Sequence, residues 1–289
     1  MTTPLLISPA ELHAAQLNQL PLLIFDCSYN LADPTAGRRA FAAGHVPGAI
    51  HADISLELSA APGHGASGGR HPLPQRELFS EWLADVGLCK NTHVIVYDQN
   101  RNNFCGRLWW MLRWVGHEAV SILDGGLETW KAFGGLIEQG QPKQRPIRGD
   151  FQQQSPLVKL VDADYVRSSL SATSVALIDA RAPERYAGQI EPLDAVAGHI
   201  PGALNRPFAD NFDSTGRFKT PQQLRQEFAQ LFNGVPAEVI HYCGSGVSAT
   251  PNVIAFELAG LGQSTLYGGS WSDWSARSDE YPKVKKQLQ

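Results

Sequence analysis

The chain has 289 residues and a formal net charge of −4, so it lacks the strongly basic character that nucleic-acid binding requires. It contains no apolar run of about 18 residues, and residues 1–15 lack the regions of a secretion signal, which favours a cytoplasmic protein without a membrane span. The four cysteines form neither a C-x-x-C pair nor a zinc pattern, so we expect reduced thiols, no metal and no cofactor.

Short apolar strands alternate with helical segments along the chain, and the whole pattern occurs twice. The first copy has predicted strands at residues 22–26 and 94–98 and the motif GHVPGA at residues 44–49. The second copy has predicted strands at residues 175–179 and 239–242 and the motif GHIPGA at residues 198–203. The alternation predicts parallel sheets covered by helices, and the near-constant offset between the copies indicates duplicated domains.

The boundary between the two copies lies within residues 139–156, a stretch rich in Gln, Pro, Arg and Gly that has no apolar periodicity. We therefore predict a first domain over residues 1–140, a linker over residues 141–156 and a second domain over residues 157–289. Each domain is of ordinary size and is long enough to form its own hydrophobic core.

The most informative segment, VIHYCGSGVSA at residues 239–249, is a strand that breaks into a glycine-spaced turn opening on Cys243. Gly244 and Gly246 let the backbone curl tightly, which places Cys243 at the mouth of a ring of backbone N–H groups. Such a ring, backed by a helix N-terminus, attracts negative charge and favours a reactive thiolate. An inert cysteine at a strand end is the less favoured alternative, because the glycines and hydroxyls of this loop serve no obvious packing purpose.

A cysteine phosphatase also uses a cysteine-opened loop between a strand and a helix. It needs an arginine where this loop has Ala249, because a guanidinium clamps phosphate through two hydrogen bonds. The loop therefore suits a bound sulfane sulfur better than a phosphate. A phosphatase-like or arsenate-reductase-like enzyme and a non-catalytic binding module of the same fold remain as alternatives.

The segment CGSGVS at residues 243–248 resembles the active loop of the rhodanese-type sulfurtransferases, and it is most similar to the 3-mercaptopyruvate sulfurtransferase form, with Ser248 in place of the usual threonine. The resemblance spans nearly the whole chain. It implies an α/β protein of two tandem rhodanese-like domains, each a parallel sheet flanked by helices. Asp98 occupies the place of Cys243 in the first copy, and a carboxylate cannot carry a persulfide, so we expect the first domain to be non-catalytic.

The resemblance implies a sulfurtransferase that moves sulfane sulfur from 3-mercaptopyruvate, through a persulfide on Cys243, to a thiol or cyanide acceptor. Transfer from thiosulfate to cyanide is the alternative. The expected partners are a small anionic sulfur donor and a thiol acceptor, and thioredoxin, a small thiol and another protein all remain open as acceptors. The transferred sulfur is expected to lie against the loop residues Gly244, Gly246, Val247 and Ser248.

Both candidate donors are anions, so their binding requires cations. The resemblance assigns this role to Arg185, within the pattern Asp-x-Arg-x-x-x-Arg-Tyr at residues 179–186, and gives Arg181 of the same pattern a structural role. In the mercaptopyruvate branch a second arginine follows a Glu-Pro pair, but here Leu193 stands at that position. We expect Arg206, just past the GHIPGA motif of the second copy, to supply the second cation.

The resemblance also suggests that Ser245, His71 and Asp53 handle protons. His71 lies in a His-x-Leu-Pro motif, and a neutral histidine near the enol oxygen of the donor can act as a general acid when the sulfur leaves. The alternative, that His71 only caps a loop, stays open. The extra residues 61–70 that precede His71 are expected to form a mobile loop.

Overall fold

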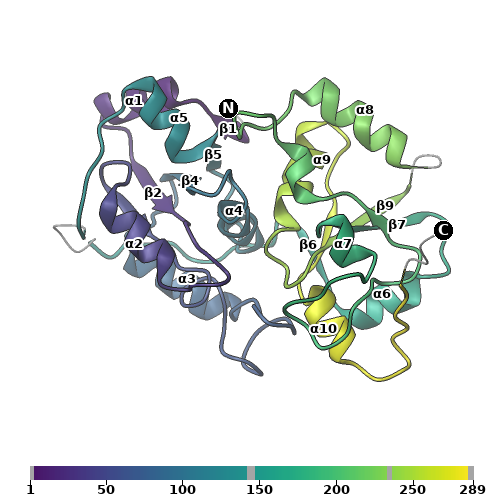
Figure 1. The fold of residues 1–289 in the computed structure, drawn as a ribbon. Coiled ribbons are helices and arrows are strands. Elements are labelled where there is room, and N and C mark those ends of the chain that lie inside the picture. Colours follow the sequence, from purple (N-terminus) through teal and green to yellow (C-terminus); the bar gives the residue numbers. More distant parts are fainter. Residues whose placement is uncertain (1–2, 142–146, 233–235, 286–289) are drawn as a thin grey trace. The chain divides into compact units, whose positions relative to one another are not determined.

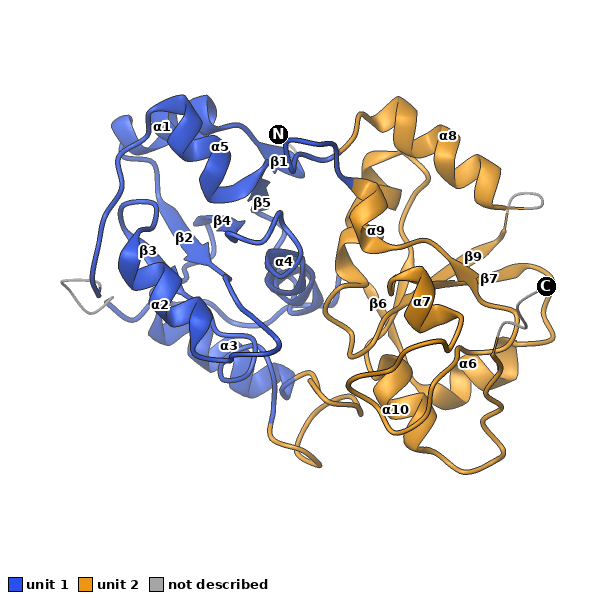
Figure 2. Cartoon of the chain, in the orientation of Figure 1, with its two compact units in different colours: residues 1–60, 74–157, 212–218 blue, residues 61–73, 158–211, 219–289 orange. Residues whose placement is uncertain are grey.

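The computed structural model describes residues 3–141, 147–232 and 236–285. The chain forms two compact units, shown as ribbons in Figure 1 and in separate colours in Figure 2. Unit 1 contains residues 1–60, 74–157 and 212–218, and unit 2 contains residues 61–73, 158–211 and 219–289. The predicted linker, residues 141–156, falls partly on residues 142–146, which lie outside the described residues.

The described part of unit 1 contains a five-stranded parallel sheet with strand order β1-β5-β4-β2-β3. Its strands are β1 (Leu6–Ile7), β2 (Leu22–Asp26), β3 (Ala49–His51), β4 (His93–Tyr97) and β5 (Val120–Leu123). Its helices are α1 (Pro9–Leu17), α2 (Ala36–Ala43), α3 (Arg76–Asp85), α4 (Cys105–Trp114) and α5 (Gly126–Phe133). Strand β4 reads His-Val-Ile-Val-Tyr and is buried along nearly its whole length, as expected for a central parallel strand covered on both faces.

Unit 2 repeats this topology position by position, with strand order β6-β10-β9-β7-β8 among the described residues. Its strands are β6 (Lys159–Val161), β7 (Val175–Asp179), β8 (Leu204–Asn205), β9 (Glu238–Tyr242) and β10 (Thr265–Tyr267). Its helices are α6 (Ala163–Ser169), α7 (Pro183–Tyr186), α8 (Pro221–Leu231), α9 (Thr250–Leu258) and α10 (Ser270–Ala276), with a 3-10 turn at Phe208–Asn211. The prediction of two parallel sheets flanked by helices is confirmed.

Each unit holds its glycine-containing motif against the end of a central strand through a buried tyrosine. The hydroxyl of Tyr97 accepts a hydrogen bond from the N–H of Val46 at 3.0 Å, and that of Tyr242 accepts from the N–H of Ile200 at 3.2 Å. Burial raises the pKa of both tyrosines well above the ordinary value, so their hydroxyls stay protonated. The duplicated GHVPGA and GHIPGA motifs therefore have the same anchoring role in both sheets.

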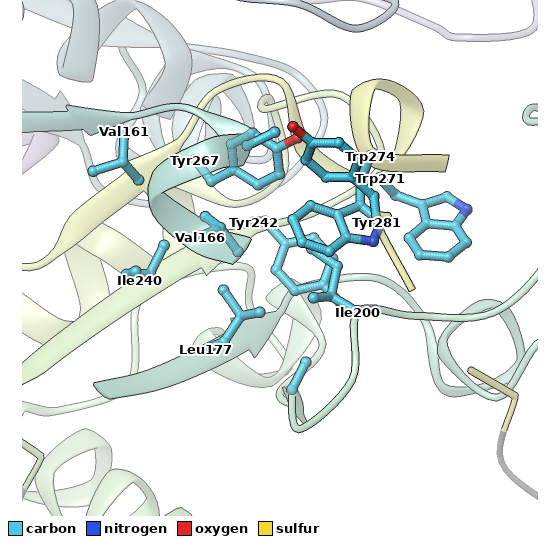
Figure 3. Packing of buried hydrophobic residues seen from close by; sticks show 12 residues of the cluster. Val161, Val166, Leu177, Ile200, Ile240, Tyr242, Tyr267, Trp271, Trp274 and Tyr281 are labelled. Atoms are coloured by element: carbon cyan, nitrogen blue, oxygen red, sulfur yellow. The ribbon is translucent and has the colours of Figure 1, made fainter. Parts of the chain in front are cut away.

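Aromatic side chains fill the core of unit 2 near the carboxyl end of β9. Figure 3 shows Tyr242, Tyr267, Trp271 and Trp274 gathered in this core, and all four are fully buried. The two tryptophans come from α10, so the packing of this core fixes the position of that helix. Among the described residues, no helix combines the length and the apolar character needed to cross a membrane.

Candidate active site

The predicted reactive cysteine lies where the sequence places it, directly after β9 and before α9. Its side chain is buried, at 2% exposure. The loop turns sharply at Gly246, whose φ is +76°, a value that side chains rarely adopt. A Cβ at this position would also lie 2.2 Å from the carbonyl oxygen of Gly268, so the loop requires glycine here for both conformation and space.

The start of α10 holds the cysteine loop in position. The N–H of Cys243 donates to Ser270 Oγ at 3.1 Å, and the carbonyl oxygens of Cys243 and Gly244 accept from the N–H groups of Trp271 and Ser272 at 3.0 and 2.9 Å. Ser270 has a φ of +55°, a costly conformation for a residue with a side chain. Sequence reasoning missed this residue, although its place between two glycines and two tryptophans was visible.

The loop presents backbone donors that the protein itself does not use. In the described part of the chain, the N–H groups of Ser245, Val247 and Ser248 have no hydrogen-bond acceptor. The N–H groups of successive residues in such a turn form a concave site for negative charge. The arrangement can therefore hold an anionic group bound to Cys243.

Two of the three residues expected to handle protons lie together in unit 2. His71 Nδ1 and Ser245 Oγ are 2.7 Å apart, and both residues are buried. Asp53 belongs to unit 1, where its carboxylate accepts a hydrogen bond from the N–H of Ser55 and its own N–H donates to Glu57. A role for Asp53 beside the other two residues stays a prediction.

Two guanidinium groups flank Gly244, the residue after the cysteine. A Cβ built at Gly244 would lie 3.3 Å from Arg185 Nη1 and 3.4 Å from Arg70 Nη2. Arg185 Nη2 donates to Glu191 at 2.6 Å, and Arg70 Nη1 donates to Asp194 at 2.6 Å. The structure thus places Arg185 next to the loop, and it adds Arg70, which the sequence analysis did not select.

Arg181 is fully engaged within the fold. Its guanidinium makes hydrogen bonds to Asp179 and Glu191 and lies 4.9 Å from the ring centroid of Trp271. Its side chain is 1% exposed, which leaves no surface for a substrate. This agrees with the structural role expected from the resemblance.

The expectation that Arg206 supplies a second cation at the loop is not supported by the geometry. Its guanidinium donates to Asn211 and to Glu227 of α8 at 2.8 Å, and it lies over the ring of Phe228. In the described part of the chain, all polar partners of this guanidinium lie outside the cysteine loop. The side chain is held by α8, a contact that a position at a strand end does not reveal. Leu193 is 41% exposed and provides no charge.

Comparisons with known proteins agree with the duplicated fold. The family described as "Rhodanese-like domain" matches residues 8–133 and 162–277. A probable 3-mercaptopyruvate sulfurtransferase of Pseudomonas aeruginosa is 44% identical over 95% of this chain and 96% of that protein. A putative thiosulfate sulfurtransferase of Mycobacterium tuberculosis is 38% identical over 94% of both chains. The structure is similar to that of a 3-mercaptopyruvate sulfotransferase, SseA of Escherichia coli, with a TM-score of 0.80 and 30% identity over 93% of this chain and all of the other.

Proposed function

Because this chain belongs to the rhodanese-type sulfurtransferases, as a tandem-domain member of the 3-mercaptopyruvate type, we propose that it carries sulfur from 3-mercaptopyruvate to a thiol acceptor through a persulfide on Cys243. The observation that carries the proposal is the loop itself, which combines a buried cysteine with backbone N–H groups that have no acceptor in the described part of the chain. Ala249 is fully buried where a cysteine phosphatase needs its arginine, so we set that alternative aside.

In the first step, the thiolate of Cys243 attacks the sulfur of the donor. A sulfur–sulfur bond forms, the carbon–sulfur bond of the donor breaks, and its electron pair remains on the three-carbon product as an enolate. A proton then converts the enolate to pyruvate. His71 is buried and hydrogen-bonded to Ser245 of the loop, and we assign this proton transfer to these two groups.

In the second step, the loop holds the outer sulfur of the persulfide as an anion. The N–H groups of Ser245, Val247 and Ser248 are preorganised donors for this charge, and such donors need no reorganisation during the reaction. An acceptor thiolate attacks the outer sulfur, and the thiolate of Cys243 leaves. The acceptor departs as a persulfide and the enzyme returns to its starting form, so the kinetics are expected to be ping-pong.

The proposal is tested on the protein without an acceptor. Incubation with 3-mercaptopyruvate should add one sulfur atom to the protein, seen by intact mass spectrometry, and should release one pyruvate per chain. The Cys243→Ser variant should keep the fold and lose both the added sulfur and all turnover. An unchanged rate in this variant would contradict the mechanism.

Thiosulfate is a second candidate donor, because the 38% identical Mycobacterium tuberculosis relative is named a putative thiosulfate sulfurtransferase. Two guanidinium groups beside Gly244 can donate hydrogen bonds to a sulfonate as well as to a carboxylate. The ratio of kcat/KM for 3-mercaptopyruvate and thiosulfate, measured with one acceptor, decides between the donors. A preference for thiosulfate would assign the protein to the other branch of the family.

We further propose a thioredoxin-like dithiol as the physiological acceptor and the cytoplasm as the site of action. The mechanism requires Cys243 as a free thiol, and cytoplasmic thiols are kept reduced. A dithiol acceptor releases the transferred sulfur as sulfide when it closes its own disulfide. Faster turnover with thioredoxin than with a monothiol at equal concentration would support this acceptor, and equal rates would argue against it.

A further inference from the structure

We propose that Arg70 is a substrate-binding residue, which together with Arg185 holds the carboxylate of the sulfur donor beside the cysteine loop. This inference rests on the proposed function, because it names a donor contact at the same site. Arg70 comes from residues 61–73, a segment that precedes α3 of unit 1 in sequence but packs as part of unit 2. No pattern around Cys243 in the sequence indicates this residue.

The position of Arg70 is set by contacts to α10. Its backbone N–H donates to Ser272 Oγ at 2.9 Å, and the N–H of the same serine donates to the carbonyl oxygen of Gly244 at 2.9 Å. One residue of α10 therefore holds both the backbone of Arg70 and the loop residue that the Arg70 side chain approaches. This common anchor keeps the guanidinium at the loop.

The two residues before Arg70 have to be glycines for the segment to pack in this way. Gly69 has a φ of +88°, and a Cβ there would lie 2.4 Å from the carbonyl oxygen of Gly269. A Cβ at Gly68 would lie 2.4 Å from the Asp273 carboxylate. The two glycines thus let the backbone pack against α10, and the arginine that follows them places a charged side chain at the cysteine loop. The end of the predicted loop, residues 61–70, is accordingly anchored within unit 2.

The hydrogen bonds of the two arginines to described residues leave at least one nitrogen of each side chain without an acceptor. Arg70 uses Nη1 for Asp194, and Arg185 uses Nε and Nη2 for Glu191. Arg70 Nη2 and Arg185 Nη1 have no acceptor in the described part of the chain, and these are the two atoms nearest to a Cβ at Gly244. Arg70 Nε is also buried and has no hydrogen-bond partner among the described residues. Donors of this kind converge on a position where a carboxylate can accept from both side chains.

Asp194 links the pair. Its Oδ1 accepts from Arg70 at 2.6 Å, and its Oδ2 is 3.5 Å from Arg185 Nη2. The carboxylate therefore offsets the repulsion between two guanidinium groups and sets their spacing. In 3-mercaptopyruvate the sulfur-bearing carbon is joined to the keto carbon, which carries the carboxylate. A carboxylate held at Gly244 consequently leaves the sulfur close to the neighbouring Cys243.

The first experiment measures how fast Cys243 reacts with two alkylating agents, iodoacetate and iodoacetamide. They differ by one carboxylate, so the ratio of their rates reports recognition of that group and cancels changes in thiol reactivity. In Arg70→Gln we expect the rate with iodoacetate, divided by the rate with iodoacetamide, to fall about tenfold or more, since a hydrogen bond to a charged group is lost. Arg167→Gln, which removes an exposed arginine of unit 2 paired with Glu280, should leave the ratio unchanged.

An unchanged ratio in Arg70→Gln would overturn the inference, including the case in which both rates fall equally. Equal falls would mean that Arg70 only supports the loop or the thiolate. Because the alkylation needs no sulfur transfer, its outcome does not depend on the proposed function. Far-ultraviolet circular dichroism and the unfolding midpoint establish that the variant is folded.

The second experiment compares two sulfur donors, 3-mercaptopyruvate and mercaptoacetone, which has the same thiol and ketone but no carboxylate. In Arg70→Gln we expect KM for 3-mercaptopyruvate to rise about ten- to a hundredfold with kcat little changed, and the constants for mercaptoacetone to stay the same. Equal losses with both donors would overturn the inference. If the unaltered protein transfers sulfur from neither donor, the proposed function fails, and the alkylation ratio still decides the role of Arg70.

Discussion

The corner between the central strand and the following helix occurs in both units and is filled in two different ways. After β4, the carboxylate of Asp98 accepts hydrogen bonds at 2.7–2.9 Å from four backbone N–H groups, those of Asn100, Asn102, Phe104 and Cys105. After β9, the corresponding residue is Cys243, and loop N–H groups lack an acceptor in the described part of the chain. The four N–H groups that bind the Asp98 carboxylate are therefore not available to another anion.

The duplicated fold thus has a structural role at the corner of unit 1 and offers a reactive site at the corner of unit 2. In unit 1 the anion is part of the chain, is permanently bound and stabilises the loop. In unit 2 the same kind of corner has a cysteine in place of the carboxylate, so the loop donors can serve an anion formed during a reaction. The geometry supports the prediction that unit 1 does not carry sulfur.

The largest effect is expected from placing the residue of unit 1 into unit 2. Cys243→Asp should remove all sulfur transfer, because a carboxylate cannot form a persulfide, and should raise the thermal unfolding midpoint, because a charged acceptor reaches the unpaired loop donors. Cys243→Ser is the matched control, which should lose transfer without the gain in stability. If the two variants unfold at the same temperature, the carboxylate does not bind the loop as Asp98 does.

The reverse change tests the unit 1 corner. Asp98→Ala should lower the free energy of unfolding by about 3 kcal/mol or more, since it leaves buried backbone donors without an acceptor. Urea unfolding followed by circular dichroism measures the change. Asp33→Ala, which removes an exposed carboxylate of the same unit, is the control and should have little effect. A minor loss in Asp98→Ala would mean that water or a rearranged loop satisfies the donors.

A smaller, pH-dependent effect distinguishes the two central strands. His241 of β9 occupies the position of Val96 in β4, and its ring nitrogens have no hydrogen-bond partner among the described residues. Burial lowers the pKa of His241 to about 3. Below about pH 6.5 the unfolded chain binds a proton that the folded chain refuses, so stability is full above that pH and is lost as the pH falls towards 3.

His241→Val, which copies unit 1, should remove this loss. The free energy of unfolding is compared at pH 7.5 and at pH 5 for both proteins. Between these two pH values the unaltered protein should lose roughly 2 kcal/mol more than the variant. Urea unfolding at the two pH values measures this difference. Parallel behaviour of the two proteins would show that His241 is not responsible for the acid sensitivity.

The smallest effect on stability is expected at Ser270, which corresponds to Gly126 in unit 1. Both residues have left-handed backbones, with φ of +55° and +62°, but only the serine supplies an acceptor for the N–H of Cys243. Ser270→Gly relieves the backbone and loses one hydrogen bond, so the free energy of unfolding should change by less than about 1 kcal/mol. Sulfur transfer should nevertheless slow several-fold, because the loop is less well held. Unchanged transfer would show that the Trp271 and Ser272 contacts suffice.

A structural feature of this protein could be predicted from the sequence when the residues that determine it are neighbours in the chain. The four predicted strands coincide with β2, β4, β7 and β9 within one residue, because apolar runs and duplicated motifs are properties of neighbouring residues. The cysteine loop could be predicted equally well, since the glycines that allow its tight turn lie within the loop itself. The role predicted for Arg206 has no support from the geometry, because the sequence places this residue at a strand end and does not show that Glu227, on a helix that follows later, binds its side chain.

Local sequence patterns were enough to predict two α/β domains, a strand-loop-helix corner in each, and the exchange of Asp98 for Cys243 between them. Three features become visible only in the folded chain: residues 61–73 pack with unit 2, Ser270 holds Cys243, and Arg70 lies beside Gly244. The physical reason is distance along the chain. Periodicity and turn chemistry act over a few residues, whereas Arg70 and Ser272 are brought together across 202 positions by the packing of α10, which no local pattern encodes.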